Sequence, residues 1–169
     1  MTAETIRAEF SGTWTLGDLP VRRIGFGAMR LTQHGEAFGE DAVPRDRDQA
    51  VAPVVCVQNM YGIGVRPEHD AFVAECGEQG VAFVPFYAIA SAGRQGGATG
   101  VEDEAVLTVA RAHGVGAAEV RVAWTLHRGP HVLAIPGTGD PGHLESNVAA
   151  GALRLSDDDL VVLEAAHRA

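Results

Sequence analysis

Hydrophobic and polar positions alternate with a period of two near the start of the chain and follow helical spacing in its second half. Residues 13–16 and the stretch from Val21 onward have the pattern of two hairpin arms, with Gly17 and Asp18 in the turn. The apolar, Gly-rich run 24–29 predicts a strand packed closely on both sides. A polar loop over 32–43 and a short helix over 44–50 are expected next, with Pro44 at a first-turn position.

Two apolar runs near the middle of the chain predict neighbouring strands. Residues 54–61 form a near-continuous β-branched run, which is typical of a strand buried on both faces of a parallel sheet. Cys56 lies in this run and is expected to be a small buried hydrophobe. Residues 81–90 predict the next strand, where Pro85 indicates a bulge or a special end. Between the two runs, a helix over 67–79 is expected to stop at Gly80.

The second half alternates between helical and extended patterns. Expected helices cover 101–113, 117–127, 141–152 and 157–167, the last capped by Ser156, and a strand is expected over 132–139. After residue 53 the order β-α-β-α-α-β-α-α predicts an α/β fold with a parallel sheet. A closed (β/α)8 barrel needs eight strands and about 250 residues. The four predicted strands therefore cannot close such a barrel alone.

Composition narrows the functional classes. The chain has 169 residues, which we interpret as one domain over 1–169, and its net charge of −9 disfavours nucleic acid as a partner. No apolar run is long enough to span a bilayer, and the first ten residues lack a signal peptide's apolar segment, so we expect a cytoplasmic protein without a membrane partner. All 13 basic residues are arginine, which excludes lysine Schiff bases, P-loops and lysine-tuned tyrosine acids. No metal-ligand spacing is present.

Chemistry in a parallel α/β architecture collects at the carboxyl ends of the strands. Arg30 follows the first predicted strand, where it either binds an anion or is a solvated charge. Asn59 ends a buried run, and it needs either a ligand or a structural hydrogen-bond partner. Tyr61 and Tyr87, which are the chain's two tyrosines, can each act as an acid or a hydrogen-bond donor, or else pack with a wet hydroxyl. These four residues are the catalytic candidates.

Several segments in order resemble the aldo/keto reductases. TWTLGDLPVRRIGFGAMRLT is similar to that family's N-terminal hairpin and first barrel strand. APVVCVQNMYGIGVRPEHDAFVAECGEQGVAFVPFYAIA resembles its sixth strand, sixth helix and seventh strand. VLAIPGTGDPGHLESNVAA resembles its eighth strand and cofactor-binding helix, and SDDDLVVLEAAHRA resembles its C-terminal helix. The resemblance covers nearly the whole chain.

The resemblance implies that an internal block is missing. PRDRDQAV runs directly into APVVCVQN, where the family has strands two to five, its Asp-Tyr-Lys-His catalytic tetrad, and a Ser-Asn pair that holds the nicotinamide amide. Part of an NADP(H) site is implied to remain. By position, Gln58 matches the residue that contacts the nicotinamide amide, Phe86 the one that stacks on its ring, and Asn147 the one that contacts adenine.

The implied phosphate contacts are altered. Gly137 and Thr138 match the loop around the adenosine phosphate. Gly137 stands where lysine is frequent, and His143 stands where arginine is frequent. Both changes weaken recognition of a 2′-phosphate, because two charge-assisted contacts are lost. The cofactor expected is therefore either none or a residual NADP(H).

These observations predict a partial TIM-type barrel, namely a four-strand half-barrel with an N-terminal hairpin. Because such a sheet would expose two edges and an apolar concave face, we expect a homodimer, or a dimer with a related chain, to complete the barrel. The leading functional hypothesis is binding of a small organic ligand in small-molecule metabolism, with a non-redox step such as cyclisation, isomerisation or dehydration. The alternatives are a residual NADPH-binding oxidoreductase and a non-catalytic binding module.

Overall fold

The computed structural model describes residues 8–25, 55–86, 88–89 and 102–169. Within these ranges the predicted hairpin and all five predicted helices are confirmed. The expected loop over 32–43 and helix over 44–50 lie outside the described residues. In chain order the elements are η1 (Ala8–Ser11), β1 (Thr13–Leu16), β2 (Leu19–Arg22), β3 (Cys56–Met60), η4 (Pro67–His69), α1 (Asp70–Glu78), β4 (Ala82–Phe86), α2 (Glu104–His113), α3 (Ala117–His127), α4 (Pro141–Ala149), η6 (Ala150–Ala152) and α5 (Asp157–His167).

Strands β3 and β4 form the centre of the sheet. They pair in parallel from Cys56 opposite Ala82 to Met60 opposite Phe86, and Pro85 fits this register without a bulge. Two further parallel bridges extend the order, one from Phe83 to Val132 and one from Ile24 to Ala134. Across the sheet, the order is therefore β3, β4, the segment 132–134 and the segment at Ile24. Four consecutive strands of a barrel are expected to have this order.

The strand expected over 132–139 is shorter than predicted. Only Val132 and Ala134 form bridges, and the chain from Ile135 to Asp140 belongs to no strand. Pro136 has no amide hydrogen to donate to a neighbouring strand, so the ladder cannot continue through it. The expected strand over 24–29 is described as far as Gly25, whose amide donates to the carbonyl of Ala134 at 2.8 Å.

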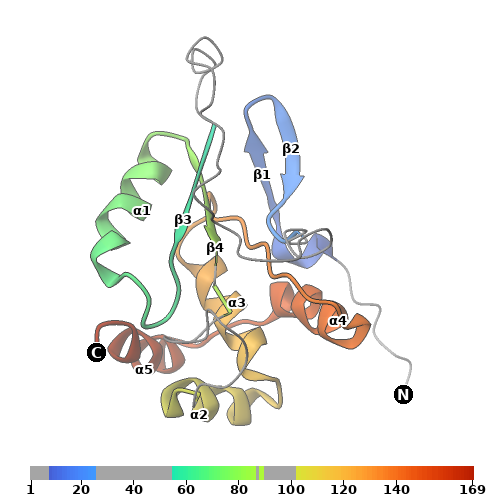
Figure 1. Ribbon diagram of the computed structural model, residues 1–169, viewed down its shortest axis with the longest axis vertical. Coiled ribbons are helices and arrows are strands. Elements are labelled where there is room, and N and C mark those ends of the chain that lie inside the picture. The colour runs from blue at the N-terminus through green and yellow to red at the C-terminus, as the bar shows by residue number, and fades with distance from the viewer. Residues whose placement is uncertain (1–7, 26–54, 87, 90–101) are drawn as a thin grey trace, which may run out of the picture.

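The two faces of the sheet have different covers (Figure 1). On one face, Phe83 packs with residues of α1, α2, α3 and α5 in the main core, which includes Val73, Trp124 and Leu163. On the other face, Ala82, Val84 and Leu133 pack against the hairpin side chains Trp14, Leu16 and Val21. We call this second surface the concave face. The hairpin therefore lies on the side of β3 and β4 opposite to the core that α1, α2, α3 and α5 form.

The prediction that β3 is buried on both faces, with Cys56 inside, is wrong. Cys56 and Gln58 are exposed, although their register partners Ala82 and Val84 are buried. Paired residues point to the same face of a sheet, so all four side chains belong to the concave face. The hairpin covers this face over β4 and leaves it open over β3. This explains why side chains of β3 on this face are exposed although the strand has an apolar sequence.

Arg23 fixes the base of the hairpin to the rest of the fold. Its guanidinium donates to the carbonyl oxygens of Ser11, Leu126, Gly129 and Val132, which lie in η1, at the end of α3 and in the segment after it. Burial, followed by the nearby charge of Arg154, lowers the pKa of Arg23. The carbonyls at the negative end of α3 compensate a cation that has been partly removed from water.

The helix ends follow their predicted capping chemistry. The Ser156 hydroxyl accepts from the Asp159 amide at 3.2 Å, and the Asp159 carboxylate accepts from the Ser156 amide at 2.8 Å, which forms a capping box at the start of α5.

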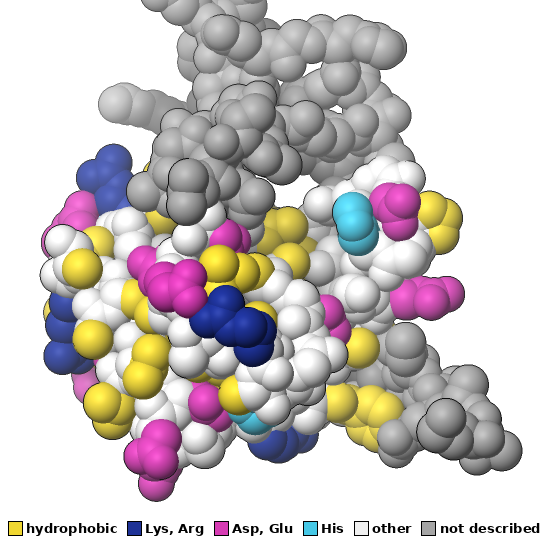
Figure 2. Space-filling model, turned by 90° about the horizontal axis from the view of Figure 1, so that it is seen from below, with side chains coloured by type: hydrophobic (Ala, Val, Ile, Leu, Met, Phe, Trp, Pro, Cys, Tyr) yellow, Lys and Arg dark blue, Asp and Glu magenta, His cyan; other side chains and the backbone are white. Residues whose placement is uncertain are grey.

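No helix among the described residues is both long and apolar enough to cross a membrane. On the face drawn in Figure 2, basic and acidic side chains are interspersed, and the basic ones form only small, separate groups.

Candidate functional site

The structure places two cofactor candidates on one face at one edge of the sheet. Gln58 of β3 pairs in register with Val84 of β4, and Phe86 lies two residues beyond Val84 in β4. Residues two apart in a strand share a face, so Gln58 and Phe86 both belong to the concave face. Gln58 is exposed and Phe86 is half-buried. Because β3 and β4 are parallel, both candidates lie towards the carboxyl ends of their strands, where the family resemblance placed them.

The remaining cofactor candidates follow the third strand segment. Gly137 is exposed and Thr138 is half-buried in the connection that leads to α4. His143 is exposed on the first turn of α4. Asn147 lies one turn further and is only 4% exposed, and its side chain forms no hydrogen bond with another described residue. The Asn147 amide is not among the enclosed side-chain atoms that lack a partner, so it reaches the surface, where it can bind a ligand.

Two catalytic candidates do not share the face of Gln58 and Phe86. Asn59 alternates with Gln58 along β3 and therefore belongs to the opposite face, and its side-chain oxygen accepts from the Met60 amide at 2.9 Å. Tyr61 is fully buried in the main core. The other two candidates, Arg30 and Tyr87, lie outside the described residues. Catalytic roles for all four stay predictions.

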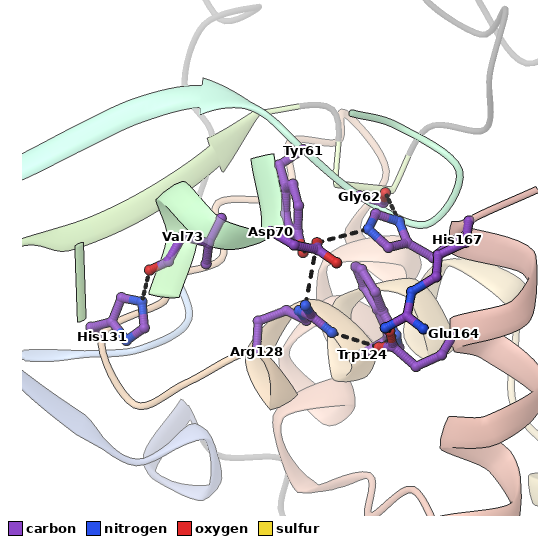
Figure 3. A network of polar contacts seen from close by, with 10 residues as sticks. Tyr61, Gly62, Asp70, Val73, Trp124, Arg128, His131, Glu164 and His167 are labelled. Carbon is purple, nitrogen blue, oxygen red and sulfur yellow. Dashed lines mark hydrogen bonds and ion pairs between the residues drawn. The ribbon is translucent and has the colours of Figure 1, made fainter. Parts of the chain in front are cut away.

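The Tyr61 phenol belongs to a buried polar network (Figure 3). It donates to the Asp70 carboxylate at 2.5 Å. Burial, reinforced by this hydrogen bond, raises the pKa of Tyr61 well above its ordinary range. A phenol in this state holds its proton, so the structure gives Tyr61 a function in joining β3 to α1.

Asp70 is the centre of the network (Figure 3). Besides Tyr61, its Oδ1 contacts His167 Nε2 at 3.0 Å and Arg128 Nη2 at 3.3 Å. Burial acts to raise the pKa of Asp70, but the hydrogen bonds from Tyr61 and His167 and the charge of Arg128 outweigh it, and the pKa is lowered. Asp70 therefore stays ionised and joins α1 to α3 and α5.

His167 contacts an acceptor with each ring nitrogen. Nδ1 lies 3.1 Å from the Gly62 carbonyl oxygen, and Nε2 faces the Asp70 carboxylate. The two contacts fix the orientation of the imidazole between the chain after β3 and the start of α1. The ring is 1% exposed and lies 4.7 Å from the Trp124 ring, centroid to centroid.

Glu164 completes the network on the α5 side. Its Oε1 accepts from Trp124 Nε1 at 3.1 Å and from Arg128 Nη1 at 2.5 Å. The Arg128 guanidinium also lies over the Trp124 ring, 5.1 Å from its centroid. Asp70, Arg128, Glu164 and His167 were not candidates at the sequence level. They come from α1, the end of α3 and α5, and only Glu164 and His167, three residues apart on α5, are near one another in the sequence.

The described residues contain no group of three or more His, Cys, Asp or Glu side chains placed to hold a metal ion. Three histidines at the ends of α2 and α3 and just after α3 have separate surroundings. His113 pairs with Asp159 at 2.8 Å, His127 is exposed, and His131 is buried and bonds the Val73 carbonyl oxygen at 2.8 Å. These contacts are structural.

The sequence profile of the Aldo/keto reductase family matches residues 21–168. The chain belongs to the aldo/keto reductase family. Pyridoxine 4-dehydrogenase of Escherichia coli is 34% identical over 148 residues, which are 88% of this chain and 46% of that protein. The chain therefore spans about half the length of this aldo/keto reductase relative, as expected of a truncated member.

Solved structures agree with this assignment. The thermostable aldo-keto reductase Tm1743, bound to the inhibitor epalrestat, is 30% identical with a TM-score of 0.57, over 67% of this chain and 40% of that one. An aldo-keto reductase from Klebsiella pneumoniae in complex with NADPH is 27% identical with a TM-score of 0.55, over 64% of this chain and 37% of that one. The α/β architecture with a partial sheet is thus that of part of an aldo/keto reductase barrel.

Proposed function

We propose that this chain binds a nicotinamide dinucleotide at the strand-end edge that carries Gln58 and Phe86. The observation that carries the proposal is Asn147, a residue of α4 that is only 4% exposed and whose side chain forms no hydrogen bond with another described residue. Gln58 supplies a second amide on the concave face, and Phe86 supplies an aromatic surface two residues beyond the Gln58 register position. The complex of a similar aldo-keto reductase with NADPH supports the class of ligand.

In the bound state, Phe86 would stack on the nicotinamide ring and the Gln58 amide would hydrogen bond its carboxamide. Asn147 would contact the adenine, which has complementary donors and acceptors. A nicotinamide supplies hydride transfer when it is bound. The open surface over Cys56 and Gln58 leaves room beside the cofactor for a small organic ligand.

A fluorescence titration of the pure protein with NADH and with NADPH tests this proposal. Asn147→Leu keeps the side-chain size and removes the amide oxygen and the amide NH2, and we expect it to weaken binding at least several-fold because two hydrogen bonds are lost. Glu145→Gln is the matched control, since Glu145 is exposed on the same helix. Absence of binding to either dinucleotide at millimolar concentration overturns the proposal.

We further propose that the chain does not perform the usual carbonyl reduction of its family. The sequence contains no lysine, so no tyrosine acid can be tuned by a lysine amine. This favours a non-redox step on a bound organic ligand as the second candidate function, with Arg30 and Tyr87 as the residues to test. Pyridoxine is the first probe ligand, because a similar relative is a pyridoxine 4-dehydrogenase.

The two candidate functions separate in one experiment. Incubation of the protein and pyridoxine with NADP⁺ or NAD⁺, followed by absorbance, detects redox turnover. Mass spectrometry of the same mixture without a dinucleotide detects a non-redox product. Reduction of either oxidised dinucleotide contradicts the non-redox proposal. A product formed without cofactor supports it, and loss of that product in Tyr87→Phe would assign the proton donor.

We also propose that a second copy of this chain completes the barrel. The described sheet has four parallel segments, and Cys56 and Gln58 of β3 are exposed on its concave face. The hairpin already covers that face over β4, so a partner needs to cover only the β3 side. Light scattering across micromolar concentrations tests this, and a monodisperse monomer throughout the range overturns it.

A further inference from the structure

The connection that leads into α4 uses its own side chains to satisfy its backbone amides. The Asp140 amide donates to the Thr138 hydroxyl at 3.1 Å. The His143 amide donates to the Asp140 carboxylate at 3.0 Å, and the Gly142 amide also donates to this carboxylate. Pro141, between them, has no amide hydrogen. The start of α4 therefore offers an approaching anion few free N–H groups.

Helix N-termini normally attract phosphate groups, because free N–H groups and the positive end of the helix dipole point outward. At α4 this position is occupied by a charged carboxylate of the chain itself. Hydrogen bonds from the His143 and Gly142 amides lower the pKa of Asp140, so the carboxylate is ionised at neutral pH. A second anion at the same place would meet a like charge, and it would also have to displace existing hydrogen bonds.

The surrounding sequence supplies no compensating charge. Residues 129–153, which cover the whole of α4 and η6, contain no arginine and no lysine, but they contain both Asp140 and Glu145. His143 is the basic side chain on α4, and it is exposed. By contrast, Asn147 and Phe86 suit the uncharged parts of a dinucleotide. The site therefore fits adenine and nicotinamide, and it does not fit a phosphate at the start of α4.

We infer that Asp140 determines cofactor specificity by excluding a phosphate from the α4 N-terminus, so that the dinucleotide bound here is NAD(H) in preference to NADP(H). This inference rests on the proposed function for the identity of the cofactor. The exclusion of phosphate itself rests only on the geometry of Asp140, Gly142 and His143.

Asp140→Ser tests the inference, because serine remains a good N-cap and removes the negative charge. Glu145→Gln removes a negative charge from the same helix without touching the cap and serves as the control. The first measurement is a nuclear magnetic resonance titration with inorganic phosphate, which follows the Gly142 and His143 amides. We expect saturable shifts in Asp140→Ser, and none in the wild-type protein or in the control.

The second measurement compares NADH and NADPH binding by fluorescence. We expect the wild-type protein to prefer NADH, and Asp140→Ser to shift the ratio of the two dissociation constants towards NADPH by roughly tenfold. The two failures are distinguishable. If neither dinucleotide binds but Asp140→Ser gains phosphate, the proposed function fails and the exclusion of phosphate stands. Tighter wild-type binding of NADPH than of NADH, or phosphate shifts that are equal in both proteins or absent from Asp140→Ser, overturns the inference.

Discussion

Asp70→Asn is the most informative single change, because Asp70 accepts three contacts that join four elements. The substitution keeps the shape of the side chain and removes its charge. Tyr61, His167 and Arg128 would then face a neutral amide, whose oxygen is a weaker acceptor than the charged Oδ1 that all three groups contact. We expect the protein to fold with a lower free energy of unfolding at neutral pH.

The size of the loss follows from the contacts. A hydrogen bond to a charged group contributes about 1.5–3 kcal/mol, and Asp70 has two of them together with an ion pair. The Asp70 side chain is 28% exposed, so water screens part of this, and the amide oxygen keeps one acceptor. We therefore expect a loss of about 2 kcal/mol, or roughly 4–8 °C in Tm for a chain of this length.

The pH dependence gives the sharper test. The folded-state pKa of Asp70 is below its ordinary value of 3.8, so its contribution to stability is present above that value and is lost as the pH falls through the folded-state pKa. The difference between the wild-type protein and Asp70→Asn should be constant near neutrality and should shrink below pH about 4. Urea unfolding followed by tryptophan fluorescence, from pH 7 downward, measures this difference.

Glu78→Gln is the matched control, since Glu78 is an exposed carboxylate on the same helix. Two results would refute the reasoning about Asp70. One is an Asp70→Asn protein as stable as the control at pH 7. The other is a stability difference that persists unchanged at low pH, which would mean that the loss does not come from ionisation of Asp70.

Three further predictions concern stability. Gly77→Ala should cost about 1–3 kcal/mol in thermal or urea unfolding, because an added Cβ would lie 2.6 Å from the His131 ring. Gly139→Ala should be nearly neutral, because its added Cβ would have nothing within 4 Å. Equal losses of stability in the two variants would contradict the packing argument. Tyr61→Phe should lower stability by about 1–2 kcal/mol and leave ligand affinity unchanged, and a loss of affinity in titration would instead indicate a role in binding. Arg23→Met should cost at least about 2 kcal/mol in urea unfolding, because its hydrogen bonds to backbone carbonyls are lost, and a neutral effect would show that they contribute nothing.

Elements that depend on local signals could be predicted from the sequence. Ser156 and the acidic residues after it defined the start of α5, and Gly17 with Asp18 located the hairpin turn. The extended segments were predicted less accurately. The β-branched run around Cys56 indicated a strand correctly, but the burial of each face depends on where the hairpin packs, and no local pattern encodes that.

The candidate site, too, could be predicted from the sequence only in part. Motif position alone placed Gln58, Phe86 and Asn147 in regions that the fold puts at the strand ends and on α4. It did not reveal that Tyr61 bonds to Asp70, because that contact depends on how the start of α1 packs beside the residue that follows β3. The network around Asp70 joins residues up to 105 positions apart, so it emerges only from the tertiary structure.

The contacts of Arg23 have a consequence for how the chain folds as it is synthesised. The hairpin can form early, because its arms are adjacent, but three of the four carbonyls that bind Arg23 belong to residues 103 to 109 positions later. The neighbouring bridge between Ile24 and Ala134 spans a similar distance. The base of the hairpin therefore stays unfixed until α3 and the following segment have left the ribosome, and Trp14 and Leu16 stay partly uncovered until Leu133 joins Ala82 and Val84. During that interval the nascent chain is most exposed to chaperones and to aggregation.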